Sequence, residues 1–314
     1  MVIDMNLVDV VIPTYRPDDA LGILLQRLHQ QTVPIGRIIL LHTEVEGEQP
    51  LKVQLSACQM EYSNVEIYTH NQVEFDHGAT RHKGMKLSSA PYVLYMTQDA
   101  VPDHAQMVAS LLEAVKQDDV AIAYARQLPN HNATILEKIT RQFNYGKVSR
   151  IKTEEDISAL GIKTFFCSNV CALYDREVYV SLGGFLKKAI FNEDMIYASK
   201  VIRSHYKIAY VAEARVIHSH NYTNKQQMQR NFDLGVSQAM NQDVFAGISS
   251  SKEGVKLILA TRKILINQGY RRKVIPMYLT SAYKWIGYQL GKRYKWLPEA
   301  LILNLTMNQG YWRK

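Results

Sequence analysis

Three groups of side chains in this sequence have the residue types and spacing for acid–base or metal chemistry. Asp99 follows Tyr92–Met96, an apolar stretch with the composition of a buried strand. Glu193 and Asp194 stand together at the start of a helical segment, and a His-x-His motif occupies 218–220. Carboxylates and imidazoles bind divalent cations and move protons. These groups could therefore hold a metal ion or supply a general base.

Asp99 lies just beyond the end of a predicted strand, a position where α/β sheets often bind ligands. The polar step 97–99 and then Pro102 end the strand. In open α/β sheets, ligands bind just outside the carboxyl ends of the strands, where a lone aspartate can hold a metal ion or a ribose. The alternative is a structural one, in which Asp99 or Asp103 caps the helix expected to start near His104.

The other two groups also have structural alternatives. Acidic side chains such as Glu193 and Asp194 are favoured at a helix N-terminus by the helix dipole alone. An ionised carboxylate there that faces a cleft would also serve as a general base. Residues 218 and 220 of an extended segment place both imidazoles on one side, which suits either surface histidines or a metal site.

The segments that must position these side chains alternate between strand and helix. Strand-like stretches occur at 9–15, 37–41, 65–68, 92–96, 120–124 and 165–174, with a short strand pair at 207–211 and 215–217. Helical spacing occurs at 21–28, 105–115, from 193 onward and at 224–240. This alternation predicts an α/β fold with three layers and a mostly parallel central sheet.

The three cysteines favour reduced thiols in a cytoplasmic protein. Cys167 and Cys171 are four residues apart in the strand expected at 165–174, so their side chains would share one face. Because no further metal ligands accompany them, we interpret the pair as core residues.

Several side chains in the first half suit a nucleotide. Tyr15 follows a strand end, where its ring could stack on a base. His77-Gly78 allows close backbone approach, and Arg81 offers a planar fork for a phosphate or a base carbonyl. The alternatives are a turn aromatic for Tyr15 and a solvated charge for Arg81. The G-x-G-x-x-G and G-K-[ST] motifs are missing from the sequence, which disfavours dinucleotide-binding folds and P-loop NTPases.

The positive charge is concentrated at the C-terminus. The formal net charge is +8, and residues 251–314 contain thirteen Lys/Arg, two acids and all three tryptophans. We therefore expect a nearly neutral domain at 1–245 and a basic, aromatic helical extension at 246–314. Lysine, arginine and tryptophan together suit a membrane interface, and the alternative is packing on the body or on a second copy.

Targeting signals are weak. No apolar run reaches the ~18–20 residues that a spanning helix needs, and Asp4 and Asp9 interrupt any leader-like stretch. The expectation is a cytoplasmic protein peripheral to the inner face of the cell membrane. A nucleic-acid partner is disfavoured because the body is not basic and carries no reading motif.

Taken together, these motifs resemble glycosyltransferase family 2, whose fold is called GT-A, over about residues 8–240. The resemblance begins at Val11–Tyr15 and includes Glu193-Asp194. Three further segments are similar to the bacterial rhamnosyltransferase branch, namely Phe75–Arg81, Thr97–Pro102 and His218–Thr223, followed by Arg230 and Phe232–Gly235.

The resemblance implies a role for each matching residue. The nucleotide contacts would be Pro13, Thr14, Tyr15, Asp76, His77, Gly78 and Arg81. Asp99 matches the metal-binding carboxylate, and His218 matches a histidine that completes the metal site in some relatives. Asp194 matches the catalytic base, with Glu193 beside it.

The sequence departs from the family pattern at two places. Thr97 stands where the family's D-x-D motif has its first aspartate, which makes Gln98 the candidate for the ribose contact. His42 and Thr43 stand where the family has paired aspartates, and Glu44 is the candidate substitute.

The implied activity is an inverting, metal-dependent transfer of L-rhamnose. The donor would be dTDP-L-rhamnose, the cofactor Mn²⁺ or Mg²⁺, and the acceptor a lipid-linked or cell-surface saccharide. Two alternatives remain, transfer of a hexose from a UDP-sugar and a non-catalytic subunit that binds sugar nucleotides. A homo-oligomer is also possible, through the C-terminal extension.

Overall fold

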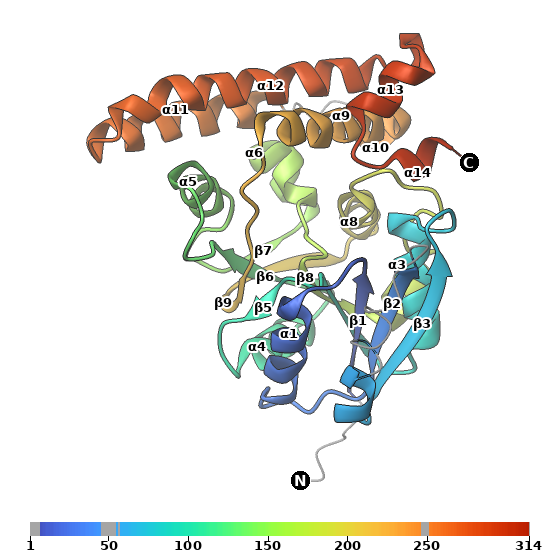
Figure 1. Ribbon diagram of the computed structural model, residues 1–314. Helices are drawn as coiled ribbons and strands as arrows, with labels where there is room; N and C mark the ends of the chain where they lie inside the picture. The colour runs from blue at the N-terminus through green and yellow to red at the C-terminus, as the bar shows by residue number, and fades with distance from the viewer. Residues whose placement is uncertain (1–6, 45–54, 56, 246–250, 314) are drawn as a thin grey trace.

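The computed structural model describes residues 7–44, 55, 57–245 and 251–313, and within them one nine-stranded sheet runs through the body (Figure 1). The strands are β1 (Val8–Thr14), β2 (Ile38–Glu44), β3 (Val65–Asn71), β4 (Tyr92–Met96), β5 (Val101–Pro102), β6 (Val120–Leu128), β7 (Arg150–Lys152), β8 (Cys171–Asp175) and β9 (Lys207–Ile217). Their order is β3-β2-β1-β4-β8-β6-β9-β5, and β7 pairs with β9.

The sheet is mixed but mostly parallel. β1 to β4, β6 and β9 point the same way, while β8 runs antiparallel between β4 and β6. The short strands β5 and β7 pair antiparallel with β9. The predicted fold class is therefore confirmed.

Helices cover both faces of the sheet. The helices of the body are α1 (Asp19–His29), α3 (His77–Leu87), α4 (Met107–Val115), α5 (Ile135–Asn144), α6 (Ile157–Leu160), α7 (Arg176–Ser181) and α8 (Glu193–Arg203). Along β1, Val10 and Ile12 pack with α1 and α4, whereas Val11 packs with α3 and α8. Successive strand residues point to opposite faces, so this alternation builds the two cores of a three-layer fold.

A further set of helices forms a layer at one end of the body (Figure 1). They are α9 (Asn224–Met240), α10 (Gln242–Phe245), α11 (Ser251–Asn267), α12 (Val274–Lys292), α13 (Glu299–Leu305) and α14 (Gln309–Trp312). The expected helical character of the extension is confirmed, and α12 packs closely along α9. The domain boundary after residue 245 stays a prediction.

Glycines bring α12 and α9 into backbone contact. A Cβ on Gly287 would lie 2.1 Å from the carbonyl oxygen of Met228, and one on Gly291 would lie 2.0 Å from that of Phe232. Such distances leave no room for a methyl group, so the two helices approach as closely as backbones can.

Gly287→Ala should lower the free energy of unfolding by about 1–3 kcal/mol, the usual cost of overpacking. Thermal melting checks this. The matched control is Gly254→Ala in α11, where nothing lies within 4 Å of the added Cβ. At that exposed helical position the change should raise stability by ~0.4–1 kcal/mol. Equal melting temperatures for the two variants would contradict the close packing.

Two of the expected strands are wrong in detail. Of the stretch 165–174, only Cys171 onward is strand, because a 3-10 turn at Gly161–Phe165 and an irregular loop precede it. Consequently Cys167 packs on the α8 side, 3.6 Å from the Tyr174 hydroxyl, and Cys171 packs on the opposite side against Met107. They do not share a face, although both are core residues as interpreted.

The strand pair expected at 207–211 and 215–217 is a single strand, β9. Its pairing with β6 shifts register between Val211 and Arg215, and the extra residues form a bulge. Glu213 is exposed within that bulge, where its carboxylate accepts a hydrogen bond from Ser149. The polar interruption in the sequence therefore marks a bulge and not a turn.

Candidate active site

A cavity of about 520 Å³ lies between the sheet and the C-terminal helices. Five of the predicted site residues line it, namely His77, Arg81, Glu193, Asp194 and His218. They come from α3, α8 and the segment after β9, which are far apart in the sequence. The fold thus brings the predicted acid–base and histidine groups into one space.

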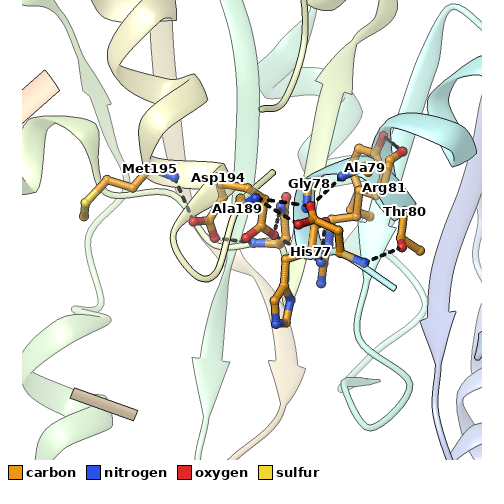
Figure 2. A network of polar contacts seen from close by, with 12 residues as sticks. His77, Gly78, Ala79, Thr80, Arg81, Ala189, Asp194 and Met195 are labelled. Carbon is orange, nitrogen blue, oxygen red and sulfur yellow. Dashed lines mark hydrogen bonds and ion pairs between the residues drawn. The ribbon is translucent and has the colours of Figure 1, made fainter. Parts of the chain in front are cut away.

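Asp194 is held at the start of α8 by two backbone donors. The Met195 N–H donates to its Oδ1 at 2.7 Å, and the Asn169 N–H donates to its Oδ2 at 3.1 Å (Figure 2). The helix begins here because Asn192 adopts a left-handed conformation, with φ 63°, that turns the chain into α8. The carboxylate is therefore fixed in direction as well as in place.

Glu193 is buried in an ion pair with Arg81. The Arg81 guanidinium lies 3.1 Å from its carboxylate, and Asn169 donates a side-chain hydrogen bond of 3.0 Å. Burial alone would raise the pKa of Glu193, but the Arg81 and His77 charges and the Asn169 bond hold that pKa below its ordinary value. Glu193 therefore remains ionised.

The pKa of Asp194 is shifted in the opposite direction from that of Glu193. Burial, and then the charge of Glu193, raise the pKa of Asp194 to about 7, against the two backbone hydrogen bonds that lower it. A carboxylate whose pKa lies close to neutral pH is well matched to accept a proton there. The two neighbouring acids thus differ, since Glu193 is ionised at neutral pH and Asp194 gains or loses its proton close to neutral pH.

Asp99 forms a cluster with two histidines. The Asp99 Oδ2 lies 3.5 Å from His218 Nε2 and 3.4 Å from His220 Nε2. One possible ligand atom from each residue lies within 4.8 Å of the others. The topology explains the cluster, because Val101 of β5 pairs with Ile217 of β9 and so sets the residues next to each strand side by side.

Gln127 sets the tautomer of His218. The Gln127 Oε1 must be an acceptor since it also receives a hydrogen bond from Arg141, which can only donate. His218 Nδ1 lies 3.1 Å from that oxygen and therefore carries the proton. The Nε2 lone pair then faces Asp99, an arrangement that a bound cation would satisfy.

The histidines are neutral, as metal ligands must be. Burial lowers the pKa of His218 to about 3. The charge of Asp99 acts to raise that pKa, and His220 acts to lower it further. Burial also lowers the pKa of His220, again opposed by Asp99. Two imidazole nitrogens and a carboxylate fit Mn²⁺ well and Mg²⁺ less well, because Mg²⁺ prefers oxygen ligands.

The predicted nucleotide contacts around β1 form a second group, beside the cavity. The Tyr15 N–H donates to Gln98 Oε1 at 2.8 Å, and Gln98 Nε2 donates to the Tyr15 carbonyl at 2.9 Å. Gln98 thus holds the segment that carries Pro13 and the exposed Tyr15 ring. Whether it also contacts a ribose stays a prediction.

The strand expected at 37–41 continues through the polar residues that follow it. β2 extends to Glu44, and its residues His42 and Thr43 are buried. Thr14 Oγ1 lies 3.2 Å from His42 Nδ1, so the ends of β1 and β2 are joined by side chains. Thr14 and Glu44 lie at neighbouring strand ends, and their contact with the nucleotide stays a prediction.

Asp76 and Gly78 have a visible structural role. Asp76 caps α3 and accepts hydrogen bonds from the backbone of Gly78, Ala79 and Ala189 (Figure 2). A Cβ on Gly78 would lie 1.9 Å from the Leu186 carbonyl oxygen. The close backbone approach predicted at this glycine is thus to the loop before α8, and it places Arg81 against Glu193.

Two further site residues, Gln127 and Asn169, were not predicted, and His220 was named only as half of the His-x-His motif. His220 had a signal, the His-x-His spacing, which places both imidazoles on one side of an extended segment. Gln127 and Asn169 had none, because each acts through contacts with residues distant in the chain. Their roles become visible only when the sheet and the loop at 166–170 are in place.

The chain matches a family model described as Glycosyl transferase family 2 over residues 9–183. The O-antigen chain rhamnosyltransferase WbaN of Salmonella anatum is 39% identical over 259 residues, 78% of this chain and 80% of that protein. The O-antigen chain rhamnosyltransferase RfbN of Salmonella typhimurium is 33% identical over 314 residues, 97% of this chain and 96% of that protein.

Solved structures share the fold at low identity. The mannosyltransferase PcManGT from Pyrobaculum calidifontis, in complex with GDP-Man and Mn²⁺, superposes with a TM-score of 0.63 at 12% identity, covering 92% of this chain and 88% of that one. S. aureus TarS 1-349 in complex with UDP-GlcNAc gives a TM-score of 0.53 at 11% identity, with 92% and 91% covered.

Proposed function

We propose the reaction of this chain from the premise that it belongs to glycosyl transferase family 2 and is a glycosyltransferase. The resemblance inferred from its motifs is confirmed on that point. The proposed reaction moves L-rhamnose from dTDP-L-rhamnose to a hydroxyl group of a growing saccharide, with inversion at the anomeric carbon. The sugar and the polysaccharide acceptor are suggested by the two relatives, which are named O-antigen chain rhamnosyltransferases.

The observation that carries the proposal is the shared cavity of Asp194 and His218. Asp194 would accept the proton of the acceptor hydroxyl as its oxygen attacks the anomeric carbon. Glu193 would keep Arg81 in place and, through its own charge, keep the pKa of Asp194 high enough for this task. A single base acting on the attacking hydroxyl suits inversion, since the diphosphate departs from the opposite face.

The cluster of Asp99, His218 and His220 would hold a divalent cation. When bound, that cation supplies Lewis acidity against the charge that develops on the departing diphosphate. Gln127 would orient His218 by accepting its Nδ1–H. Tyr15, held through Gln98, would contact the nucleotide base.

The test is turnover of a panel of sugar nucleotides. The protein is incubated with dTDP-L-rhamnose, UDP-hexoses and GDP-mannose, each with and without Mn²⁺ or Mg²⁺, and release of the nucleoside diphosphate is measured. We expect release from dTDP-L-rhamnose that requires the metal. Turnover of a UDP-hexose instead would favour the alternative donor, and turnover of none would favour a non-catalytic subunit.

The C-terminal extension offers a surface for a lipid-linked acceptor. Apolar side chains recur at helical spacing along the solvent side of α12, and all are more than 40% exposed: Ile275, Tyr278, Leu279, Trp285 and Ile286. A basic turn, Arg271–Lys273, precedes them. Among the described residues, no helix combines the length and hydropathy that a bilayer crossing requires. We infer peripheral contact with an anionic membrane, with a second copy of the chain as the alternative partner.

The paired change Trp285→Ser and Ile286→Ser should weaken binding to anionic phospholipid vesicles by about tenfold or more, because burying each side chain contributes ~1.5–3 kcal/mol. Added salt should weaken binding by the wild type as well. Co-sedimentation measures both effects. The matched control is Ile23→Ser with Val180→Ser, two exposed apolar residues of the body. If all of the wild type stays in the supernatant at low salt, the membrane proposal is wrong.

A further inference from the structure

Two cations in the cavity wall lack a carboxylate partner. Arg230 of α9 and Lys284 of α12 line the cavity, and neither forms a hydrogen bond or an ion pair with any residue that the structure describes. The other two arginines of the wall differ, since Arg81 pairs with Glu193 and Arg141 pairs with Glu137 at 2.7 Å. The wall therefore carries two positive charges that no internal ion pair offsets.

Arg230 is positioned by aromatic rings. Its guanidinium carbon lies 4.6 Å from the centroid of Phe191 and 5.9 Å from that of Tyr222. Cation–π contacts use the face of the guanidinium and leave its N–H edge available. Tyr222 in turn lies against His220, with ring centroids 5.0 Å apart. Arg230 is thus held close to the proposed metal site with its donors unused.

Lys284 reaches the cavity because the glycines of α12 allow close packing on α9. Burial lowers the pKa of Lys284, opposed by Glu137 and reinforced by Arg230. A partly buried ammonium without a hydrogen-bonding partner is costly, and such costs are common where a ligand supplies the missing partner. Lys284 comes from outside the segment 9–183 that matches the family model.

We propose that Arg230 and Lys284 together bind the two phosphates of a diphosphate, and that the C-terminal extension thereby completes the active site. Arginine provides a planar fork and lysine a point charge, a combination suited to phosphate oxygens. The identity of the diphosphate rests on the proposed function. It belongs either to the nucleotide of the donor or to a lipid-linked acceptor.

Lys284→Gln and Arg230→Gln should each weaken the binding of inorganic pyrophosphate by about tenfold or more, the usual value of a charged hydrogen bond. The binding of dTDP should weaken equally if the diphosphate is that of the donor. Isothermal titration in the presence of Mn²⁺ measures both ligands. Lys284→Arg should retain most of the affinity. The matched control is Lys292→Gln, which removes the same charge from an exposed position on the same helix and should change neither affinity.

Steady-state kinetics with each substrate varied in turn then separates the two sources. A raised KM for the donor in Lys284→Gln assigns the donor diphosphate, and a raised KM for the acceptor alone, with dTDP affinity unchanged, assigns the acceptor diphosphate. Unchanged affinities and unchanged KM values in folded Lys284→Gln and Arg230→Gln would overturn the proposal, as would equal losses in Lys292→Gln. Pyrophosphate binding requires no sugar transfer, so a failed donor assay rejects the proposed function without rejecting this site.

Discussion

Replacing Asp194 by Asn is expected to lower turnover by at least about 10²–10⁴-fold, the usual contribution of a general base. Donor binding should remain nearly unchanged, because Asn retains the shape of Asp194 and the cation would be held elsewhere, by Asp99 and the histidines. Turnover is measured as release of nucleoside diphosphate in the presence of acceptor, and donor affinity by titration calorimetry. The matched control is Asp233→Asn, another buried acid that bonds to Thr306 and does not line the cavity. A retained rate in Asp194→Asn would remove this carboxylate from the mechanism.

The same residue should set the pH dependence. The base must be ionised to accept a proton, and the pKa of Asp194 is raised to about 7 by burial and by Glu193. Turnover should therefore rise about tenfold per pH unit below pH 7 and level off above it. Glu193→Gln removes the neighbouring charge, so the midpoint of the profile should move to lower pH. A profile that stays flat from pH 5 to pH 8 would contradict the assignment.

The effect of Asp194→Asn on stability should depend on pH. A carboxyl whose pKa is higher in the folded state contributes most to stability below its ordinary pKa of 3.8, and loses that contribution as pH rises to about 7. At pH 8 the wild type holds a desolvated carboxylate beside Glu193, which the variant lacks. The amide of the variant can accept only one of the two backbone hydrogen bonds, at every pH. Thermal melting should therefore find the stability difference between wild type and variant smaller at pH 8 than at pH 5.

The parts of the site that the sequence predicted follow from local rules. Asp99 lies three residues after the end of an apolar strand, and Asp194 lies in the first turn of an amphipathic helix. Strand ends and helix starts can be recognised from a few neighbouring residues, and the parallel order of the sheet brings them to the same region. The fold class was therefore predictable from the sequence, and so was the place of both carboxylates in the fold, while their metal-binding and catalytic roles stay predictions.

The parts that the sequence did not predict depend on contacts across the fold. Gln127 acts on His218 over 91 positions, and Asn169 acts on Asp194 over 25. Asn169 lies in a loop that its apolar neighbours made resemble a strand, and that misassignment also put Cys167 on the wrong face. The periodicity of apolar residues describes helices and strands only. It therefore cannot predict a loop that is stabilised by tertiary contacts.

The predicted nucleotide contacts show a second limit of prediction from the sequence. Asp76, Gly78 and Gln98 were assigned to the nucleotide, and each also has contacts within the protein. A residue that positions a ligand-binding loop and a residue that touches the ligand occupy similar places in a sequence. Contacts within the protein give these residues a structural role, and their contacts with the nucleotide stay a prediction.

The last prediction concerns the metal cluster, where the expected loss is as large as at Asp194. Asp99→Asn, His218→Asn and His220→Asn should each weaken Mn²⁺ binding, and each should lower metal-dependent turnover by about 10²-fold or more. A Lewis acid contributes several kcal/mol to transition-state stabilisation, and 1.4 kcal/mol corresponds to a factor of ten. Removing metal with a chelator should abolish wild-type turnover, and adding Mn²⁺ should restore it.

His220 is the most informative of the three positions because the resemblance to the family assigned the metal to Asp99 and His218 alone. If the cluster acts as a unit, His220→Asn should raise the Mn²⁺ concentration needed for half-maximal turnover as much as His218→Asn does. The matched control is His205→Asn, an exposed histidine with φ 65° whose left-handed conformation asparagine tolerates. If His220→Asn behaves like His205→Asn, then His220 is only a neighbour of the cation and the site consists of two protein ligands.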